Sequence, residues 1–164
     1  MRVSTRGRYA LRAMLDLALH EGAGPVPRRT IVARQGFSSA YVAHLFRRLQ
    51  AAGLVKGVKG PGGGYVLARP TASISAGDVV RAVEGPIAVV RCVAPGGEQL
   101  CTRTEECVTR TLWQRLSATV AGFLDAITLQ DLCDEVQEAA AREAVREAAQ
   151  PFHQKEDRED GANL

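Results

Sequence analysis

The stretch of sequence that decides the fold is residues 38–67, SSAYVAHLFRRLQAAGLVKGVKGPGGGYVL. Ser38 or Ser39 can cap a helix that stops at Gly53, and its inward face carries Val42, Leu45, Phe46 and Leu49. Residues 54–58 and 64–67 then form two short apolar runs around a turn rich in glycine. A helix followed directly by such a hairpin indicates a winged DNA-binding domain.

Two further helices are predicted upstream of this stretch. Apolar residues recur at helical spacing over residues 8–19, and Gly22 follows them. Residues 28–35 begin after Pro27 and stop at Gly36, a residue suited to the positive φ of a tight turn between helices. Two short helices joined by a glycine turn are typical of a helix-turn-helix. We therefore expect a mainly α protein with a small β-wing, built on a winged helix-turn-helix domain.

The outward face of the third helix and the hairpin carry the candidate DNA contacts. Small and polar side chains there would reach base edges, and the lysines of the hairpin would reach phosphates. The predicted contacts, with the basic N-terminus included, are Arg2, Ser38, Ser39, Ala40, Ala43, His44, Arg47, Lys56, Lys59 and Gly60. A nucleotide site in the glycine-rich turn is not favoured, because the turn lacks the lysine of a P-loop and joins two strands.

Charge is divided unevenly along the 164-residue chain, although the net charge is only +3. Up to Pro70 there are 12 Lys and Arg residues against Asp16 and Glu21, about +10, and the remainder carries 9 basic against 16 acidic residues, about −7. A basic half joined to an acidic half predicts a module that binds a polyanion and a separate part that does not. The composition, 46% apolar but only 5% aromatic, suits helices.

The second half of the chain is predicted to be helical and to mediate dimerisation. Ser75 and Asp78 form a capping box for one helix, and Thr128 with Asp131 forms another for residues 129–150. Between them, a long helix opening near Thr102 or Thr104 has an apolar stripe with no partner left in the chain. We expect this stripe to pair with that of a second copy, through Leu112, Leu116, Val120, Phe123 and Ile127.

Four segments are expected. Residues 1–85 form the DNA-binding domain and residues 86–107 a cysteine-bearing loop. Residues 108–150 form the dimerisation and C-terminal helices, and residues 151–164 a polar, disordered tail. The sequence shows neither an apolar span of membrane length nor a secretory signal, so we expect a cytoplasmic protein without membrane contact.

Cys92, Cys101 and Cys107 are gathered on one loop, and Cys107 is expected to enter the long helix. Soft thiolates favour iron–sulfur units, zinc or cuprous ions, and a helix N-terminus favours the thiolate form. By spacing alone a metal site, a redox switch and a set of cysteines without a role all remain open. Cys133 falls on the apolar side of its helix and is expected to be a buried, inert thiol. No nucleophile with a matching base is evident, so an enzyme is not expected.

Several motifs resemble the IscR-like family of iron–sulfur cluster regulators. They are MRVSTRGRYA at residues 1–10, GPVP at 24–27, RQG at 34–36, LFRRL at 45–49, GPGGGY at 60–65, GFL at 122–124 and ITL at 127–129. The resemblance implies a homodimeric winged-helix repressor that binds an operator in double-stranded DNA and controls iron–sulfur assembly, iron or oxidative-stress genes. It also implies an iron–sulfur cluster on Cys92, Cys101 and Cys107, with 2Fe-2S preferred over 4Fe-4S.

The chain departs from that family pattern at residues that bear on function. Arg110 stands where a histidine ligand is expected, while Ala43 and His44 replace a glutamate and a glutamine of the recognition helix. A guanidinium cannot ligate iron. The fourth ligand would then be Glu98, Glu105 or Glu106, an exogenous thiol or water, since Arg8 and Arg12 replace the acidic residue that serves in some relatives. Arg110 would instead pair with the cluster or with Glu106.

One alternative function keeps the same fold. The chain would then be a DNA-binding regulator that uses its cysteines as a thiol–disulfide or zinc switch, or responds to a protein or small-molecule partner without a cluster.

Overall fold

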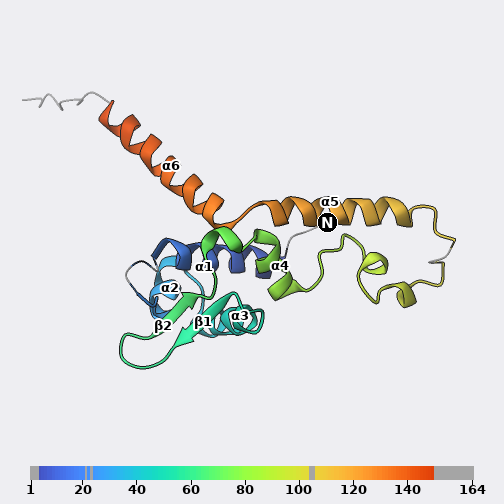
Figure 1. Cartoon of the computed structure of the whole chain (residues 1–164), viewed down its shortest axis with the longest axis horizontal. Helices are drawn as coiled ribbons and strands as arrows, with labels where there is room; N and C mark the ends of the chain where they lie inside the picture. The colour runs from blue at the N-terminus through green and yellow to red at the C-terminus, as the bar shows by residue number, and fades with distance from the viewer. Residues whose placement is uncertain (1–3, 21, 23, 104–105, 150–164) are drawn as a thin grey trace, which may run out of the picture. The chain divides into compact units, whose positions relative to one another are not determined.

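The computed structural model describes residues 4–20, 22, 24–103 and 106–149, and the fold it shows is mainly helical (Figure 1). One antiparallel hairpin of two strands accompanies the helices, so the predicted class, mainly α with a small β-wing, is confirmed. In chain order the elements are α1 (Thr5–His20), α2 (Arg28–Gln35), α3 (Ser39–Ala51), β1 (Val55–Val58), β2 (Gly64–Leu67), η2 (Thr71–Ser73), α4 (Ala76–Glu84), η3 (Arg91–Val93), η4 (Glu98–Leu100), α5 (Arg110–Ala126) and α6 (Leu129–Ala148).

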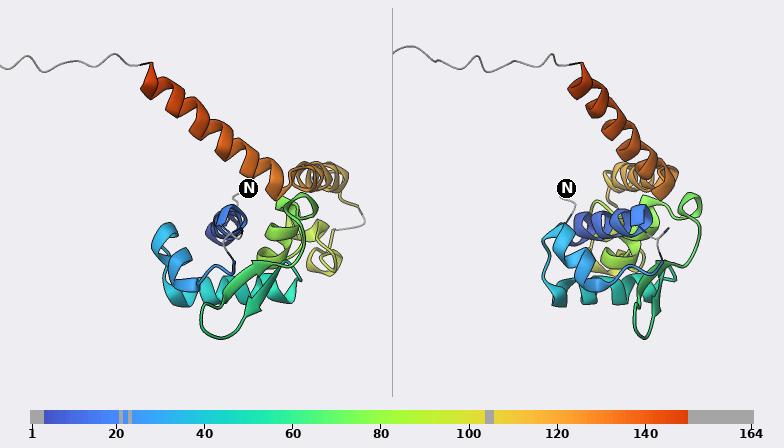
Figure 2. Two further views of the ribbon diagram at one scale, coloured as in Figure 1. Left: turned by 60° about the vertical axis from the view of Figure 1, so that its left-hand side comes forward. Right: turned by 90° about the vertical axis from the view of Figure 1, so that its left-hand side faces the viewer.

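The core lies among the first four helices. Helix α4 packs against both α1 and α3, and α2 packs against α3, as the two views of Figure 2 allow the reader to follow. The largest side chains without solvent exposure are Phe46, Met14, Leu17, Ile31, Leu45 and Leu49. Each such side chain contributes about 1.5–3 kcal/mol of burial free energy, so this cluster is what orients α3.

The wing is fixed to the domain by a third extended segment. Val55 pairs with Leu67 and Val58 with Gly64 in the hairpin, and Val26 forms a two-way backbone bridge with Tyr65, both N···O distances being 2.9 Å. A Cβ atom on Gly64 would lie 2.2 Å from the carbonyl oxygen of Val26. Glycine is therefore required where the hairpin passes the segment that leads into α2.

The helix signals proposed from sequence are confirmed. Ser38 Oγ accepts the backbone N–H of Tyr41 at 3.2 Å, and Gly36 ends α2 in the left-handed conformation with φ of 70°. Reciprocal capping boxes join Ser75 with Asp78 and Thr128 with Asp131. These local hydrogen bonds set where α3, α4 and α6 begin.

Two helix starts differ from the sequence prediction. Helix α1 begins at Thr5 and not at residue 8, because Ser4 Oγ accepts the backbone N–H groups of Arg6 and Gly7. The long helix begins at Arg110, so the proposed start near Thr102, which lies in a turn, is wrong. The preceding segment has little to pack against, since Val108 is 92% exposed, and a short helix needs tertiary packing.

The described residues up to Cys133 form one compact unit, and those from Asp134 form another, which consists of the rest of α6. Within the described part of the chain, no helix combines the length and apolar character that crossing a bilayer requires. Arg2, Glu105 and the tail at residues 151–164 lie outside the described residues. The four-segment division by function stays a prediction.

Candidate DNA-binding surface and cysteine loop

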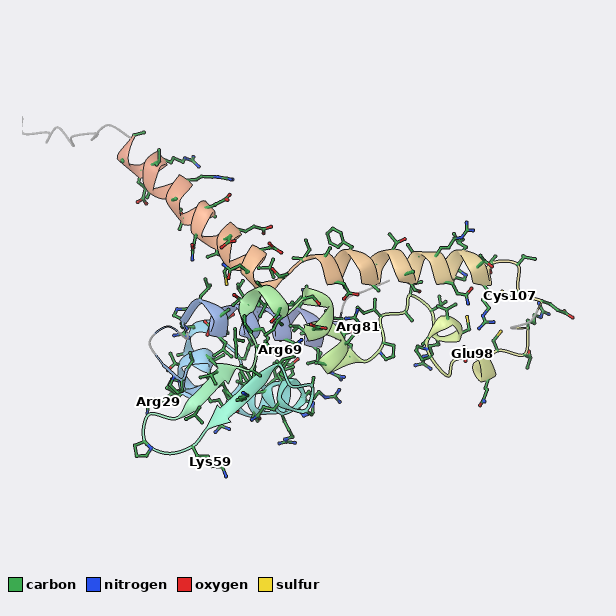
Figure 3. The ribbon with its side chains drawn as sticks, viewed as in Figure 1. Arg29, Lys59, Arg69, Arg81, Glu98 and Cys107 are labelled. Atoms are coloured by element: carbon green, nitrogen blue, oxygen red, sulfur yellow. The ribbon has the colours of Figure 1, made fainter. Side chains whose placement is uncertain are left out.

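The face of α3 that points away from the core carries the sequence-predicted DNA contacts. Because Val42, Leu45 and Phe46 are fully buried on the other side of the helix, the residues between them turn outward. Ser38, Ser39, Ala40, His44 and Arg47 are exposed, whereas Ala43 is half-buried. Lys56, Lys59 and Gly60 are exposed on the wing, where Figure 3 labels Lys59. The outward face of α3 and the wing are thus both exposed to solvent within the same compact unit.

An ion pair between a buried aspartate and a partly exposed arginine, which sequence analysis did not identify, fixes α2 on α1. Asp16 is 4% exposed and accepts two hydrogen bonds from Arg34, at 2.8 and 2.7 Å, and one from Gln35 at 3.1 Å. Burial raises the pKa of Asp16, but the hydrogen bonds from Arg34 and Gln35 outweigh it and lower the pKa below 3.8. An aspartate on an otherwise apolar helix face, at Met14–Asp16–Leu17, was the available signal.

The last turn of α4 is bonded directly to the recognition helix. The carbonyl oxygen of Val83 accepts hydrogen bonds from Arg48 of α3 at 2.9 Å and from Arg6 of α1 at 3.3 Å. Next to it, the carboxylate of Glu84 accepts from Ser4 Oγ at 2.7 Å and from the backbone N–H of Gly7 at 2.9 Å. The cysteine-bearing segment follows immediately, so it leaves an end of α4 that is bonded to both α1 and α3.

Helix α5 is attached to α4 and to the cysteine loop. Arg81 donates to both carboxylate oxygens of Asp125, and a Cβ atom on Gly77 would collide with that carboxylate. Ser117, which is 8% exposed, accepts the backbone N–H of Val89 at 3.1 Å and donates to the carbonyl of Trp113. The N-terminal part of the loop is therefore held against α5.

Two of the three loop cysteines lie in or beside short helices that pack together, and the third lies just before α5. Cys92 is in η3, which contacts both η4 and α5, Cys101 directly follows η4, and Cys107 precedes α5 by three residues. Cys107 does not enter the helix as expected, because the helix starts at Arg110. Among the described side chains no three His, Cys, Asp or Glu groups converge as metal ligands would. Cys133 is 5% exposed, as predicted for a thiol in the core.

Charge near Cys107 favours an anion. Hydrogen bonding to Thr109 lowers the pKa of the Cys107 thiol, and the nearby Arg110 guanidinium adds to this effect. Arg110 lies 3.6 Å from Glu98 and makes no ion pair with Glu106, so the expected helical pair is replaced by a contact across the loop. Arg110 Nε is buried and has no hydrogen-bond partner among the described residues. The Cys107 thiol beside this cation is a soft donor of the kind that holds an anionic thiolate-bound cluster.

The apolar stripe of α5 is partly open. Leu112, Leu116 and Phe123 are 57%, 40% and 66% exposed, whereas Val120 and Ile127 are half-buried. The carbonyl of Ile127 accepts the backbone N–H of Ala76 at 2.8 Å, which draws that end of the stripe onto α4. An exposed row of large apolar side chains on a helix is unfavourable in water and marks a contact surface.

Comparison with known proteins places the chain among transcriptional regulators. The Rrf2 family, described as an iron-dependent transcriptional regulator family, matches residues 3–135. The HTH-type transcriptional regulator IscR of Escherichia coli K12 is 44% identical over 150 residues, which cover 90% of this chain and 91% of that protein.

Two solved structures illustrate the breadth of the family. CymR, the global cysteine regulator of Bacillus subtilis, superimposes with a TM-score of 0.69 and 38% identity over 82% of this chain and 98% of that one. IscR of T. potens gives a TM-score of 0.68 and 38% identity, covering 85% of this chain and 90% of its own.

Proposed function

Because the chain belongs to the Rrf2 family of transcriptional regulators, we propose that it is a repressor whose DNA binding is controlled by an iron–sulfur cluster on Cys92, Cys101 and Cys107. It is an IscR-type regulator of transcription and not an enzyme, because its family and its relatives are transcriptional regulators. A 2Fe-2S cluster is preferred and 4Fe-4S is the alternative. Genes for iron–sulfur assembly, iron or oxidative stress are the proposed targets.

The cluster proposal rests on the thiols of the cysteine loop and on the cationic side chain that lies beside Cys107 at the start of α5. Three cysteines lie on one loop, and the buried Nε of Arg110 lacks a partner among the described residues beside Cys107. When bound, the cluster would supply a redox-sensitive anion. Cys92, Cys101 and Cys107 would hold it as thiolates, and Arg110 would balance its charge.

A route from the cysteine loop to the DNA surface is available in this chain's own contacts. Val83 accepts from Arg48 of α3, and Val89 donates to Ser117 of α5. Residues 83–89 therefore contact the recognition helix at one end and α5 at the other. We propose that a change in the order of the loop alters the position of α3 through the bond between Arg48 and Val83.

Members of this family bind DNA as dimers, and the open stripe of α5 is the proposed dimer surface. Leu112, Leu116 and Phe123 would meet the same residues of a second copy, with Val120 and Ile127 at the border. Two recognition helices related by a two-fold axis would then reach half-sites about 34–36 Å apart, or a multiple of that.

A second candidate mechanism has specific support. One structural neighbour is described as a cysteine regulator, and the same regulator of Staphylococcus aureus is described in an oxidized form. The lowered pKa of Cys107 would equally favour attack of its thiolate on an oxidant or a disulfide. In this case the thiols themselves, without a cluster, would set DNA binding.

Anaerobic purification separates the two mechanisms. We expect a coloured protein with visible absorption and bound iron and sulfide, and we expect the colour to vanish in C92S, C101S and C107S. C133S is the matched control, because Cys133 is buried away from the loop and its replacement should leave the spectrum unchanged. A colourless wild type whose DNA affinity changes on thiol oxidation would establish the second mechanism, and stoichiometric zinc would indicate a zinc site.

A further inference from the structure

A groove between the wing and the start of α2 has a composition suited to a phosphate. It has a volume of about 350 Å³ and is lined by Pro27, Arg28, Arg29, Ser39 and the wing glycines Gly62 and Gly63. The bridge between Val26 and Tyr65 brings these segments together, since it holds the residues before α2 against the hairpin. We infer that Arg28 and Arg29 clamp a backbone phosphate of the DNA in this groove, an inference that rests on the proposed DNA binding.

The two arginines are available for an external ligand. Both are exposed, and neither makes a side-chain hydrogen bond or ion pair within the part of the chain that the structure describes. The acidic residue described in this half of the chain, Asp16, is already bound by Arg34. Among the described residues, therefore, no acidic side chain neutralises either arginine.

Their position on α2 is unfavourable for the helix itself. They occupy its first two positions, where the helix dipole repels cations, and Pro27 provides no side-chain cap. A local cost of this kind at an exposed site indicates selection for function and not for stability. The same helix end attracts anions, so a phosphate there would interact favourably with the dipole and with both guanidinium groups.

The lining of the groove also favours a phosphodiester over a bulky ligand. Gly62 and Gly63 present backbone without side chains, which allows a sugar–phosphate strand to approach closely. Ser39, at the first turn of α3, adds a hydroxyl at the edge of the proposed recognition surface. Lys59 lies on the same wing loop, as Figure 3 shows, so the clamp continues a cationic border next to the recognition helix.

The test compares R28A/R29A with wild type on two labelled duplexes, one selected by the wild-type protein from a random library and the other a shuffled version of it. Affinity should fall by about tenfold or more for both at low salt. The slope of log affinity against log salt should fall by about 0.9 for each phosphate that the variant no longer neutralises. R142A/R146A removes the same charge from α6 and should change neither quantity.

The stability of the variant supplies a separate control. R28A/R29A should unfold at the wild-type temperature or slightly above it, because it removes two cations from a helix N-terminus. R28K/R29K should keep the salt slope while binding less tightly, since lysine retains the charge but not the paired hydrogen bonds.

The possible outcomes separate this inference from the proposed function. A wild type that enriches no sequence from the library and binds no random duplex at low salt would overturn DNA binding itself. Normal wild-type binding with unchanged affinity and slope in R28A/R29A would overturn the clamp alone. A weakening confined to the selected sequence would also overturn it, because the arginines would then read bases. Unchanged affinity in R28K/R29K would exclude paired hydrogen bonding to phosphate even if the alanine variant failed to fold.

Discussion

The DNA-binding part of this protein differs from the region between the cysteine loop and α5. The two regions differ in how completely the chain buries its apolar side chains and pairs its charged groups. In the first, large side chains such as Phe46 and Met14 are fully buried, and the one described acid up to Pro70 is paired inside. In the second, Phe123 and Leu112 are more than half exposed, and the buried Arg110 Nε has no partner among the described residues. Exposed apolar side chains and a buried donor without a partner are features expected of a surface that binds an external partner.

The largest expected effect is on dimerisation, through the exposed apolar stripe of α5. L116E places a charge in the α5 stripe and should give monomers, with operator affinity lower by about 10²–10⁴-fold because two half-sites no longer bind together. Analytical ultracentrifugation and DNA titration measure the two quantities. V145E is the control, since Val145 on α6 is 69% exposed but outside the stripe. A dimeric L116E with intact operator binding would refute this dimer surface.

In the well-packed DNA-binding part, removal of the buried aspartate should lower stability. D16A removes a buried carboxylate and leaves Arg34 and Gln35 without their acceptor, and because Arg34 is partly exposed the variant should cost about 1–3 kcal/mol of unfolding free energy. D125A removes an exposed pair with Arg81 and should cost about 1 kcal/mol or less, measured in the same denaturant titrations. Equal costs for the two variants would show that burial does not distinguish these ion pairs.

The same pair predicts a pH dependence. The pKa of Asp16 is lower in the folded protein than the usual 3.8, so its ionised form stabilises the fold above that pH. This contribution should be lost as the pH falls through the lowered pKa. Stability measured between neutral and acidic pH should therefore drop less steeply in D16A than in wild type, and parallel curves would contradict this assignment.

A moderate effect is expected where the two regions meet. R48M removes the hydrogen bond to Val83, and the difference in DNA affinity between the cluster-bound and cluster-free protein should shrink. Couplings of this kind typically span about 5–150-fold in affinity. R47M, on the neighbouring exposed position, should lower affinity in both states while leaving their ratio intact. An unchanged ratio in R48M would exclude this route.

The cysteine loop predicts a change in cluster lifetime. R110H replaces a group that cannot ligate iron by one that can, so the visible absorption should persist longer in air. R115H, further along α5, is the control. An unchanged lifetime in R110H would show that position 110 does not contribute to the cluster site.

The smallest effect is expected at the wing. K59A removes one proposed phosphate contact and should lower the salt slope by about one while weakening binding to every sequence alike. H44A should alter sequence preference more than overall affinity, because His44 lies on the outward face of α3. Mobility-shift titrations with operator and shuffled duplexes measure both. If neither variant changes binding, the recognition surface lies elsewhere.

Several helix boundaries could be predicted from the sequence because the signals that set them are local. Ser38, Gly36 and the boxes at Ser75 and Thr128 act within a few residues, so the helix boundaries they set could be read from the chain. The winged helix-turn-helix followed from these boundaries and from the spacing of apolar residues. The cysteines on the loop and the family resemblance were equally visible.

Contacts between residues far apart in the chain became evident only in the folded structure. Arg34 with Asp16, Arg48 with Val83, and Arg110 with Glu98 join different segments, and periodicity carries no information about such pairs. The start of α5 at Arg110 was missed because the residues before it have too little to pack against, although they resemble a capped helix start. Arg28 and Arg29 gained their proposed role only because the bridge from Val26 to Tyr65 sets α2 beside the wing. Local hydrogen bonding is encoded in adjacent residues, whereas such long-range contacts depend on how the whole core packs.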